Sequence, residues 1–356
     1  MPITRAYKTS GILGGATTNG ETLVADSSAT TGLRWQGNFA AGKNKIINGD
    51  FGIWQRGTSF TNLNDAYGAD RFKHYITASA PSTYSITQQT FTPGTAPVAG
   101  YEGTYFLRQT APTSGTVTEI DVAQVIEDVR TFAGQTITFS FWAKSSANLT
   151  LKSLIQQRFG SGGSAQVNLT LQSNSVTTSW QRFTHTMSVP SVAGKTIGAN
   201  SGMWVFLFAD TIATSQTIDT WGWQVEAGNT ATAFQTATGT LAGELAACQR
   251  YYWRLATGAN QSIGNFNNYN SAIMQGIIQF PVTMRGTPTL DSVSGTDFYK
   301  FVRNNGSDTF NSFTLEYPNA TSTNIYNGSE ISGTAGHAGI VSVNNASGYV
   351  GFSAEL

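Results

Sequence analysis

The feature that most constrains this chain is a two-residue alternation of side-chain character. In the segment 137–144, ITFSFWAK, Phe139 and Phe141 fall on one face and Trp142 and Lys144 fall on the other. A period of two places successive side chains on opposite faces of a β-strand. Similar alternation, or an apolar run of strand length, recurs at residues 149–152, 167–171, 180–184, 203–208 and 218–225. The pattern predicts an all-β protein.

Short strands need frequent turns, and the composition supplies turn residues. The 356 residues include 38 Gly, and Ser, Thr and Asn are also frequent. Aromatic residues make up 12% of the chain, which provides apolar surface for a core and argues against disorder. This length suggests two or three domains.

Charge and cysteine content exclude several classes of protein. Lys and Arg number 20 and Asp and Glu number 20, so no basic surplus is present to neutralise nucleic-acid phosphates. A single cysteine, Cys248, excludes an intrachain disulfide and a thiolate metal cluster. The sequence contains no apolar run of about 18 residues, so no membrane insertion is expected.

The beginning of the chain cannot build a core of its own. Residues 1–44 contain few large apolar side chains, although 22–25 and 33–35 have the composition of short strands. This part is either a flexible leader or an extended anchor that becomes ordered against other proteins, and we favour the anchor. Residues 45–71 follow, where a turn at Asn48-Gly49-Asp50 is expected to lead into a strand.

The distribution of alternating segments predicts how the rest of the chain is divided into domains. Residues 45–236 predict one β-sandwich, in which 203–208 is apolar on both faces and is expected to be a fully buried strand. Residues 237–256 predict a connecting helix, and residues 257–356 a second β-sandwich with a hairpin at Asn304-Asn305-Gly306. The helix would pack on a neighbouring sheet or form a three-helix contact between subunits through the stripe Leu241, Leu245, Cys248, Tyr252 and Leu255.

Several segments resemble bacteriophage tail-fibre and virion appendage proteins. Residues 48–57, NGDFGIWQRG, and 69–72, ADRF, are similar to the opening of a β-sandwich domain in that family, which is itself similar to carbohydrate-binding jelly rolls. The middle and end of that domain are matched by residues 122–127, 133–144, 223–228 and 231–234. Residues 23–28 and 31–35 resemble leaders of cyanobacterial phage structural proteins, and 248–252 with 280–289 resemble a C-terminal module of tail and fibre proteins. The resemblance implies a jelly-roll domain.

No motif for catalysis is present. His74, His185 and His337 are far apart in sequence, and no nucleophile elbow, phosphate loop or His-Glu-x-x-His motif occurs. A glycan-cleaving enzyme needs two carboxyl groups near its substrate. The acidic pairs that could supply them are Asp65 with Asp70, Glu119 with Asp121, and Glu127 with Asp128. Such pairs are common in β loops, so we predict a protein that is not an enzyme.

Sugar binding fits the residues better, because it needs flat aromatic faces and planar polar groups. Trp142 lies opposite the core-facing positions of its strand, and Lys144 and Gln224 are expected to share its face. The alternative is that a second layer or a subunit partner covers Trp142. The resemblance also implies a structural calcium at Asp50 and Glu226, although Gly52 stands where the sugar-binding relatives carry an acidic residue.

These expectations combine into one functional hypothesis. The protein is a non-enzymatic phage virion component, a homotrimeric tail fibre that contacts host-surface polysaccharide. Residues 1–44 would dock on other virion tail or neck proteins after assembly in the host cytoplasm. The alternatives are a head decoration or neck fibre protein and a glycan-degrading depolymerase.

Overall fold

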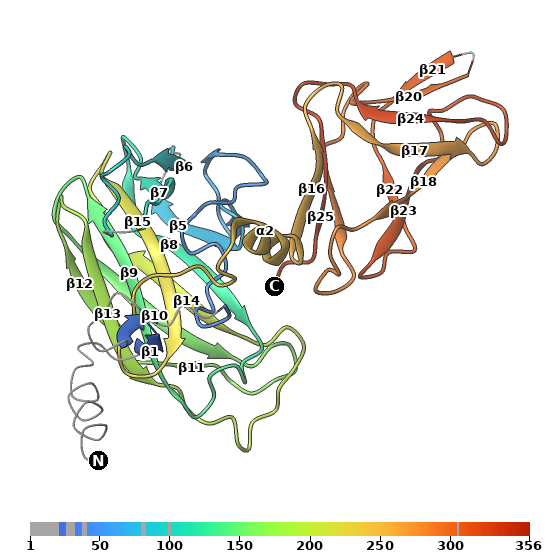
Figure 1. Ribbon diagram of the computed structural model, residues 1–356. Coiled ribbons are helices and arrows are strands. Elements are labelled where there is room, and N and C mark those ends of the chain that lie inside the picture. The colour runs from blue at the N-terminus through green and yellow to red at the C-terminus, as the bar shows by residue number, and fades with distance from the viewer. Residues whose placement is uncertain (1–20, 26–32, 38–40, 80–82, 99–100, 305) are drawn as a thin grey trace, which may run out of the picture. The chain divides into compact units, whose positions relative to one another are not determined.

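The computed structural model describes residues 21–25, 33–37, 41–79, 83–98, 101–304 and 306–356. They form two compact units, shown in Figure 1. The larger unit contains the described residues up to Leu241, apart from two short segments, and the C-terminal unit contains those segments and Ala242–Leu356. Nearly all regular structure is β-strand, so the all-β prediction is confirmed.

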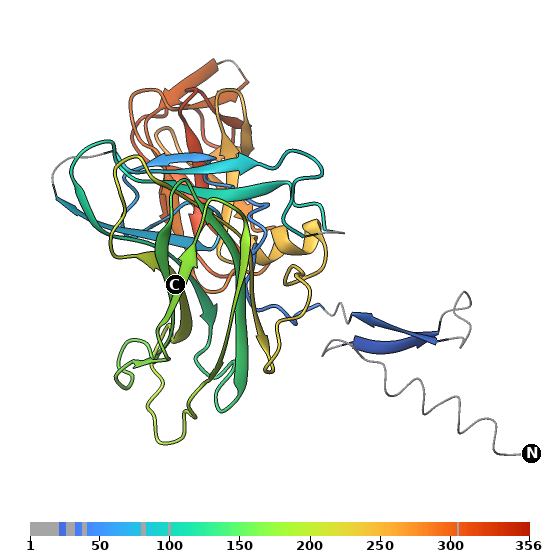
Figure 2. The same cartoon turned by 90° about the vertical axis from the view of Figure 1, so that its left-hand side faces the viewer.

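The larger unit is built on two antiparallel sheets, which can be followed in Figures 1 and 2. The first, named here the Trp204 sheet, has the order β11 (Val167–Asn168), β10 (Leu149–Arg158), β14 (Gly202–Ala209), β8 (Thr116–Glu127), β5 (Phe72–Ser79) and β4 (Ala66–Tyr67), with β12 (Gln172–Val176) also paired to β10. The second, the Trp142 sheet, has the order β13 (Gln181–Ser188), β9 (Thr136–Ser145), β15 (Thr217–Ala227), β7 (Tyr105–Thr110), β6 (Ser85–Thr90) and β3 (Ser59–Thr61).

The core of this unit is an aromatic cluster that the alternation of β9 helps to build. Phe139 and Phe141 are fully buried, and the ring centroid of Phe139 lies 5.5 Å from that of Trp223. Phe72 packs edge-on to Trp223 at 5.2 Å and lies 4.4 Å from Phe51. Burying each such ring contributes about 1.5–3 kcal/mol, so these residues stabilise the sandwich.

The predicted strand after Asn48-Gly49-Asp50 is absent. The amide of Phe51 donates to the carbonyl of Asn48 at 2.9 Å, which confirms the tight turn. Asn48 and Phe51 have φ values of 59° and 56°, so the backbone there is left-handed and cannot continue as an extended strand. Gly49 is required because a Cβ would stand 2.3 Å from the carbonyl oxygen of Trp223. Instead of forming a strand, the segment buries apolar side chains in the core.

A buried histidine is expected to make the larger unit sensitive to acid. His74 is fully buried on β5, and burial lowers its pKa to about 3. The unfolded chain takes up this proton below pH 6.5, so stability should be full above that pH and fall as pH drops toward 3. We expect a loss of about 2 kcal/mol by pH 5. Urea denaturation at several pH values would measure it, and His74→Phe should remove this part of the slope whereas His337→Gln should retain it. An unchanged slope in His74→Phe would contradict this assignment.

The C-terminal unit also contains two sheets. One has the order β16 (Tyr252–Thr257), β25 (Tyr349–Ser353) and β19 (Thr289–Ser292). The other has the order β21 (Gly306–Phe310), β20 (Tyr299–Arg303), β24 (Ala338–Val343), β17 (Ser262–Asn268), β18 (Met274–Gln279), β23 (Ser322–Asn327) and β22 (Thr314–Glu316). The pairing of β20 with β21 confirms the predicted hairpin. The core includes Phe266, Tyr299, Phe301, Phe310 and Phe352.

The connecting helix predicted at 237–256 is wrong in length. The helix, α2, spans Leu241–Gln249, and the chain then enters β16 at Tyr252. Cys248 is buried, as expected for a small core residue, but Leu241 and Leu245 are 73% and 38% exposed. The predicted stripe therefore runs through two different elements. Aromatic residues 251–253 favour a pleated surface over a helix.

Two early segments, Ile53–Gly57 and Ala69–Arg71, belong to the C-terminal unit. Arg56 and Arg71 both form ion pairs with Glu355, whose side chain is 6% exposed. The guanidinium of Arg56 lies 3.5 Å from the ring centroid of Tyr252, and that of Arg71 lies 3.4 Å from Tyr251. Two cations, one carboxylate and two aromatic rings thus form a mostly buried cluster.

A second pair of residues extends this cluster. The backbone amide of Gln55 donates to Asp70 at 2.9 Å, and its side-chain amide donates to Asp70 and to the carbonyl of Tyr252. Asp70 is 1% exposed, and burial raises its pKa although Arg56 opposes the change. Much of the family-like motif at residues 53–57 and 69–71 therefore stabilises the end of the chain.

The predicted anchor, residues 1–44, lies largely outside the described residues. Its two predicted strands are confirmed: β1 (Glu21–Ala25) pairs antiparallel with β2 (Leu33–Gly37), and Figure 2 draws the pair in dark blue. None of the helices in the described part of the chain is long and apolar enough to span a membrane.

Candidate functional site

The predicted glycan-binding residues Trp142 and Lys144 lie on the outer face of the Trp142 sheet, as their alternation with the core residues of the strand predicted. That face carries a second aromatic layer, because Trp221 is fully buried there against Phe234 at 4.7 Å. The indole nitrogen of Trp142 is buried, and Lys144 pairs with Asp219 at 3.6 Å. Trp142 as a whole is half-buried, so only part of its ring is open to a sugar.

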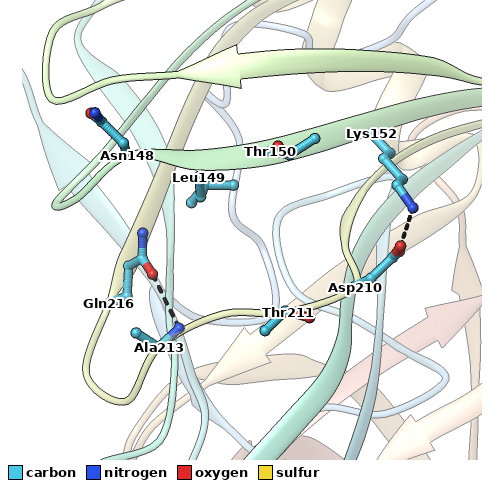
Figure 3. Close-up of a pocket in the computed structure, with 8 residues that line it drawn as sticks. All are labelled: Asn148, Leu149, Thr150, Lys152, Asp210, Thr211, Ala213 and Gln216. Carbon is cyan, nitrogen blue, oxygen red and sulfur yellow. Dashed lines mark hydrogen bonds and ion pairs between the residues drawn. The ribbon is translucent and has the colours of Figure 1, made fainter.

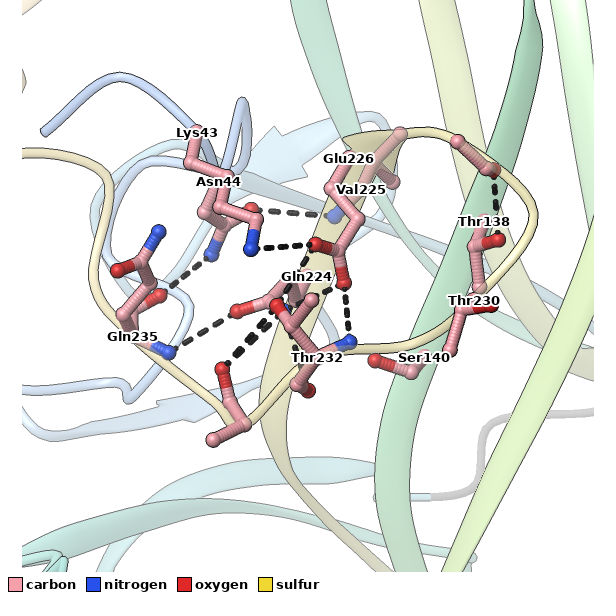
Figure 4. Close-up of polar contacts among 12 residues, drawn as sticks. Lys43, Asn44, Thr138, Ser140, Gln224, Val225, Glu226, Thr230, Thr232 and Gln235 are labelled. Atoms are coloured by element: carbon pink, nitrogen blue, oxygen red, sulfur yellow. Dashed lines mark hydrogen bonds and ion pairs between the residues drawn. The ribbon is translucent and has the colours of Figure 1, made fainter. Parts of the chain in front are cut away.

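Gln224 and Glu226 share this face but lie beneath the segment that leaves the sheet (Figure 4). The amide of Gln224 donates to Glu226 at 2.7 Å, and its carbonyl accepts from the backbone amide of Gln235 at 2.9 Å. Glu226 also accepts from the amide and hydroxyl of Thr232, at 2.8 and 2.7 Å, and pairs with Lys43 at 3.5 Å. These two side chains hold residues 232–235 in place.

The calcium site at Asp50 and Glu226 stays a prediction. Asp50 accepts hydrogen bonds from the hydroxyl of Tyr101 at 3.2 Å and from the amide of Gly52 at 3.4 Å, and burial raises its pKa. The oxygens of Glu226 are occupied by the donors described above. Among the described residues, no group of three or more His, Cys, Asp or Glu side chains is placed to hold a metal ion.

A second aromatic surface, in which Phe206 is 7% exposed, lies on the outer face of the Trp204 sheet. On β14, Met203, Val205 and Leu207 point into the core and are at most 1% exposed. Trp204, Phe206 and Phe208 therefore point outward, and Trp204 and Phe208 are half-buried. The rings of Trp204 and Phe206 are stacked, with centroids 5.8 Å apart and planes 17° apart. We name this surface, with Lys73, Tyr75, Asp121, Lys152 and Arg158, the Trp204 face.

Two cations reach Trp204 from other strands of the same sheet. Arg158, at the end of β10, places its guanidinium carbon 4.1 Å from the ring centroid of Trp204 and 5.3 Å from that of Phe206. Lys73, on β5, lies 5.9 Å from Trp204 and 5.5 Å from Tyr75. Stacked rings beside planar polar groups are the chemistry that binds sugar rings and their hydroxyls.

A carboxyl group sits within the same face. Asp121 on β8 is opposite Phe208 on one side and Tyr75 on the other. Burial, followed by the charges of Glu119 and Asp210, raises the pKa of Asp121 to about 8. Asp121 is therefore protonated near neutral pH and can donate a hydrogen bond.

A hollow of about 400 Å³ lies beside one end of the Trp204 face, at the ion pair between Lys152 and Asp210 (Figure 3). Lys152 is paired in register with Phe208, and its ammonium lies 6.0 Å from that ring. The remaining lining residues are Asn148, Leu149, Thr150, Thr211, Ala213 and Gln216. Uncharged polar side chains in a hollow of this size suit a sugar unit.

The sequence pattern at 203–208 did not predict that one face of this strand is partly exposed. Because all six residues are apolar, the segment was expected to be buried on both sides, but Trp204 and Phe208 are half-buried. Lys73, Lys152 and Arg158 are the signal that was available, since strands that carry cations at alternate positions have a solvent face. The convergence of Lys73 and Arg158 on Trp204 depends on strand order, which could not be predicted from the sequence.

Comparisons with known proteins gave structural matches only. No family model and no curated protein matches the chain. A family 4 carbohydrate-binding module matches with 21% identity over 51% of this chain and 100% of its own, at a TM-score of 0.33. The enzymatically active domain of bacteriophage CBA120 tailspike protein 4 matches with 16% identity over 52% of this chain and 22% of its own, at a TM-score of 0.34. TmCBM61 in complex with β-1,4-galactotriose matches with 8% identity over 52% of this chain and 99% of its own, at a TM-score of 0.31. These likenesses are too distant to transfer a site.

Proposed function

We propose that this protein binds a glycan on the Trp204 face and does not cleave it. The observation that supports this most is that Trp204, Phe206 and Phe208 point outward from the sheet. The cationic groups of Arg158 and Lys73 lie against the Trp204 ring. A protein that had no ligand for this surface would gain by covering or replacing an outward Trp. The flat face offers stacking, and the cations and Asp121 offer hydrogen bonds to hydroxyls.

The proposal extends to a role in a phage virion. The motifs at residues 48–57, 69–72 and 248–252 resemble those of tail fibres, so we place the chain in a homotrimeric tail fibre that contacts host-surface polysaccharide. Residues 1–44 would join it to other virion proteins. A trimeric mass in analytical ultracentrifugation is the expected result, and a monomer at micromolar concentration would contradict the trimer.

A depolymerase is the second candidate, because Asp121 lies opposite Phe208 and Tyr75 and Glu119 precedes it by two residues on the same strand face. Asp121, with its raised pKa, could act as a general acid. However, the charge of Glu119 helps to raise the pKa of Asp121, so the two carboxyl groups are in close contact. Glycosidases hold their two carboxyl groups at least about 5 Å apart. This contact disfavours the two-carboxylate mechanism for that pair.

Affinity electrophoresis tests the proposal directly. The intact protein would be run through gels containing neutral and acidic bacterial polysaccharides, and reducing ends would be assayed in parallel. We expect at least one polysaccharide to retard migration without release of reducing ends. Migration unchanged in every gel would overturn glycan binding, and sustained release of reducing ends would overturn the non-catalytic role.

A further inference from the structure

Arg158 differs from the other two cations of the Trp204 face in having no carboxylate partner. Lys73 pairs with Asp65 at 2.6 Å, and Lys152 pairs with Asp210. The described residues provide no ion pair for Arg158, and the one hydrogen bond that they give its side chain runs from Nε to Oε1 of Gln156 at 2.8 Å. Its Nη1 and Nη2 groups are therefore available for a ligand.

The position of Arg158 is costly for an unpaired cation. Its side chain is half-buried against Trp204 and Phe206, and burial lowers its pKa from the usual value. Removing a cation from water is unfavourable unless a hydrogen-bonded anion accompanies it. The carboxyl within the Trp204 face, Asp121, lies opposite Phe208 and Tyr75 and forms no ion pair with Arg158, and its pKa is raised by burial. The surface thus keeps one net positive group beside its most prominent ring.

From this arrangement we infer that the ligand of the Trp204 face is an acidic glycan, and that Arg158 binds the carboxylate of a uronic acid unit. The inference depends on the proposed glycan binding and names its substrate class. A guanidinium offers parallel N–H donors that match the two oxygens of a carboxylate. Because the guanidinium carbon lies over the Trp204 ring, 4.1 Å from its centroid, a sugar unit bound beside that ring also lies within reach of the guanidinium.

The same placement explains why an acidic unit is selected over a neutral one. Hydroxyls of a neutral sugar accept hydrogen bonds from arginine but do not neutralise its charge, so the cost of the half-buried cation remains. A carboxylate removes that cost and gains charge-assisted hydrogen bonds. Sulfate esters share the anionic charge but are not planar carboxylates, and they provide a separate arm of the test.

The experiment compares matched polysaccharides and matched variants. Affinity electrophoresis and calorimetry would use polygalacturonate, alginate and hyaluronan, the same polymers after chemical reduction of their carboxyl groups, and a sulfated galactan. The proteins would be the intact chain, Arg158→Gln and the control Arg130→Gln. Arg130 is exposed and already pairs with Asp128, so its loss should leave binding unchanged. Thermal unfolding would confirm that both variants are folded.

We expect binding to at least one polyuronate, weakened roughly 10- to 100-fold both by carboxyl reduction and by Arg158→Gln. Arg158→Gln should weaken binding of the neutral, reduced polymer much less than binding of the polyuronate, because only a neutral hydrogen bond is lost. Equal affinity for the polyuronate and its reduced form would overturn the acidic ligand while retaining glycan binding. A preference for the sulfated galactan, or retention by neutral polymers only, would overturn the uronate assignment in the same way. Failure of every polymer to bind would overturn glycan binding itself.

Discussion

Replacing Glu355 with Gln is expected to lower the free energy of unfolding of the C-terminal unit by about 3–5 kcal/mol. Gln retains the shape of Glu but removes the charge that Arg56 and Arg71 share. Both guanidinium groups lie in a largely buried cluster, and a buried cation without its partner is strongly destabilising. Guanidinium denaturation followed by tryptophan fluorescence would measure the change.

Asp128→Asn is the matched control for this variant. Asp128 also pairs with an arginine, Arg130, but their side chains are 45% and 60% exposed. Exposed ion pairs contribute about 0–1 kcal/mol, so this control should move the transition little. An equal, small effect in both variants would contradict the importance of the Glu355 cluster. Removal of residues 355–356 should reproduce the loss seen with Glu355→Gln.

Trp204→Ala is expected to weaken glycan binding by about 2 kcal/mol or more, which is roughly 30-fold in Kd. The substitution removes the ring on which the sugar would stack and the surface against which Arg158 is held. Because Trp204 points away from the core, the fold should tolerate the change. Isothermal titration calorimetry with the polysaccharide that binds the intact chain would measure the loss.

Trp142→Phe serves as the control because Trp142 belongs to the sheet face that residues 232–235 and a second aromatic layer occupy. It should retain nearly the full affinity of the intact chain. A loss with Trp142→Phe and none with Trp204→Ala would reverse the assignment and favour the site containing Trp142, Lys144 and Gln224.

The positions of the strands could be predicted from the sequence, but the segments that cover each face of the sheets could not. The alternation of residues 137–144 correctly placed Phe139 and Phe141 inward and Trp142 and Lys144 outward. It could not reveal that Gln224 and Glu226 would hold a later segment of chain across that face. Period two fixes which side of a strand a residue occupies, and only tertiary packing decides which side meets solvent.

Ionic contacts between residues far apart in the chain could not be predicted from the sequence either. Glu355 is 284 and 299 residues from its partners Arg71 and Arg56. The motif that contains those arginines was expected to open the first sandwich, yet residues 53–57 and 69–71 belong to the C-terminal unit. The helical pattern of apolar residues also gave a wrong prediction at α2. It predicted that the helix continues through Tyr252, whereas β16 begins at that residue.

The most direct test of the central claim is an NMR titration of the indole N–H signals of the eight tryptophans with an oligosaccharide of the polymer that binds. Each signal would be assigned by a single Trp→Phe variant. Glycan binding on the Trp204 face predicts a saturable shift of the Trp204 signal, with Trp142 and the buried Trp221 and Trp223 unmoved. A saturable shift of the Trp142 signal, with Trp204 unchanged, would contradict it.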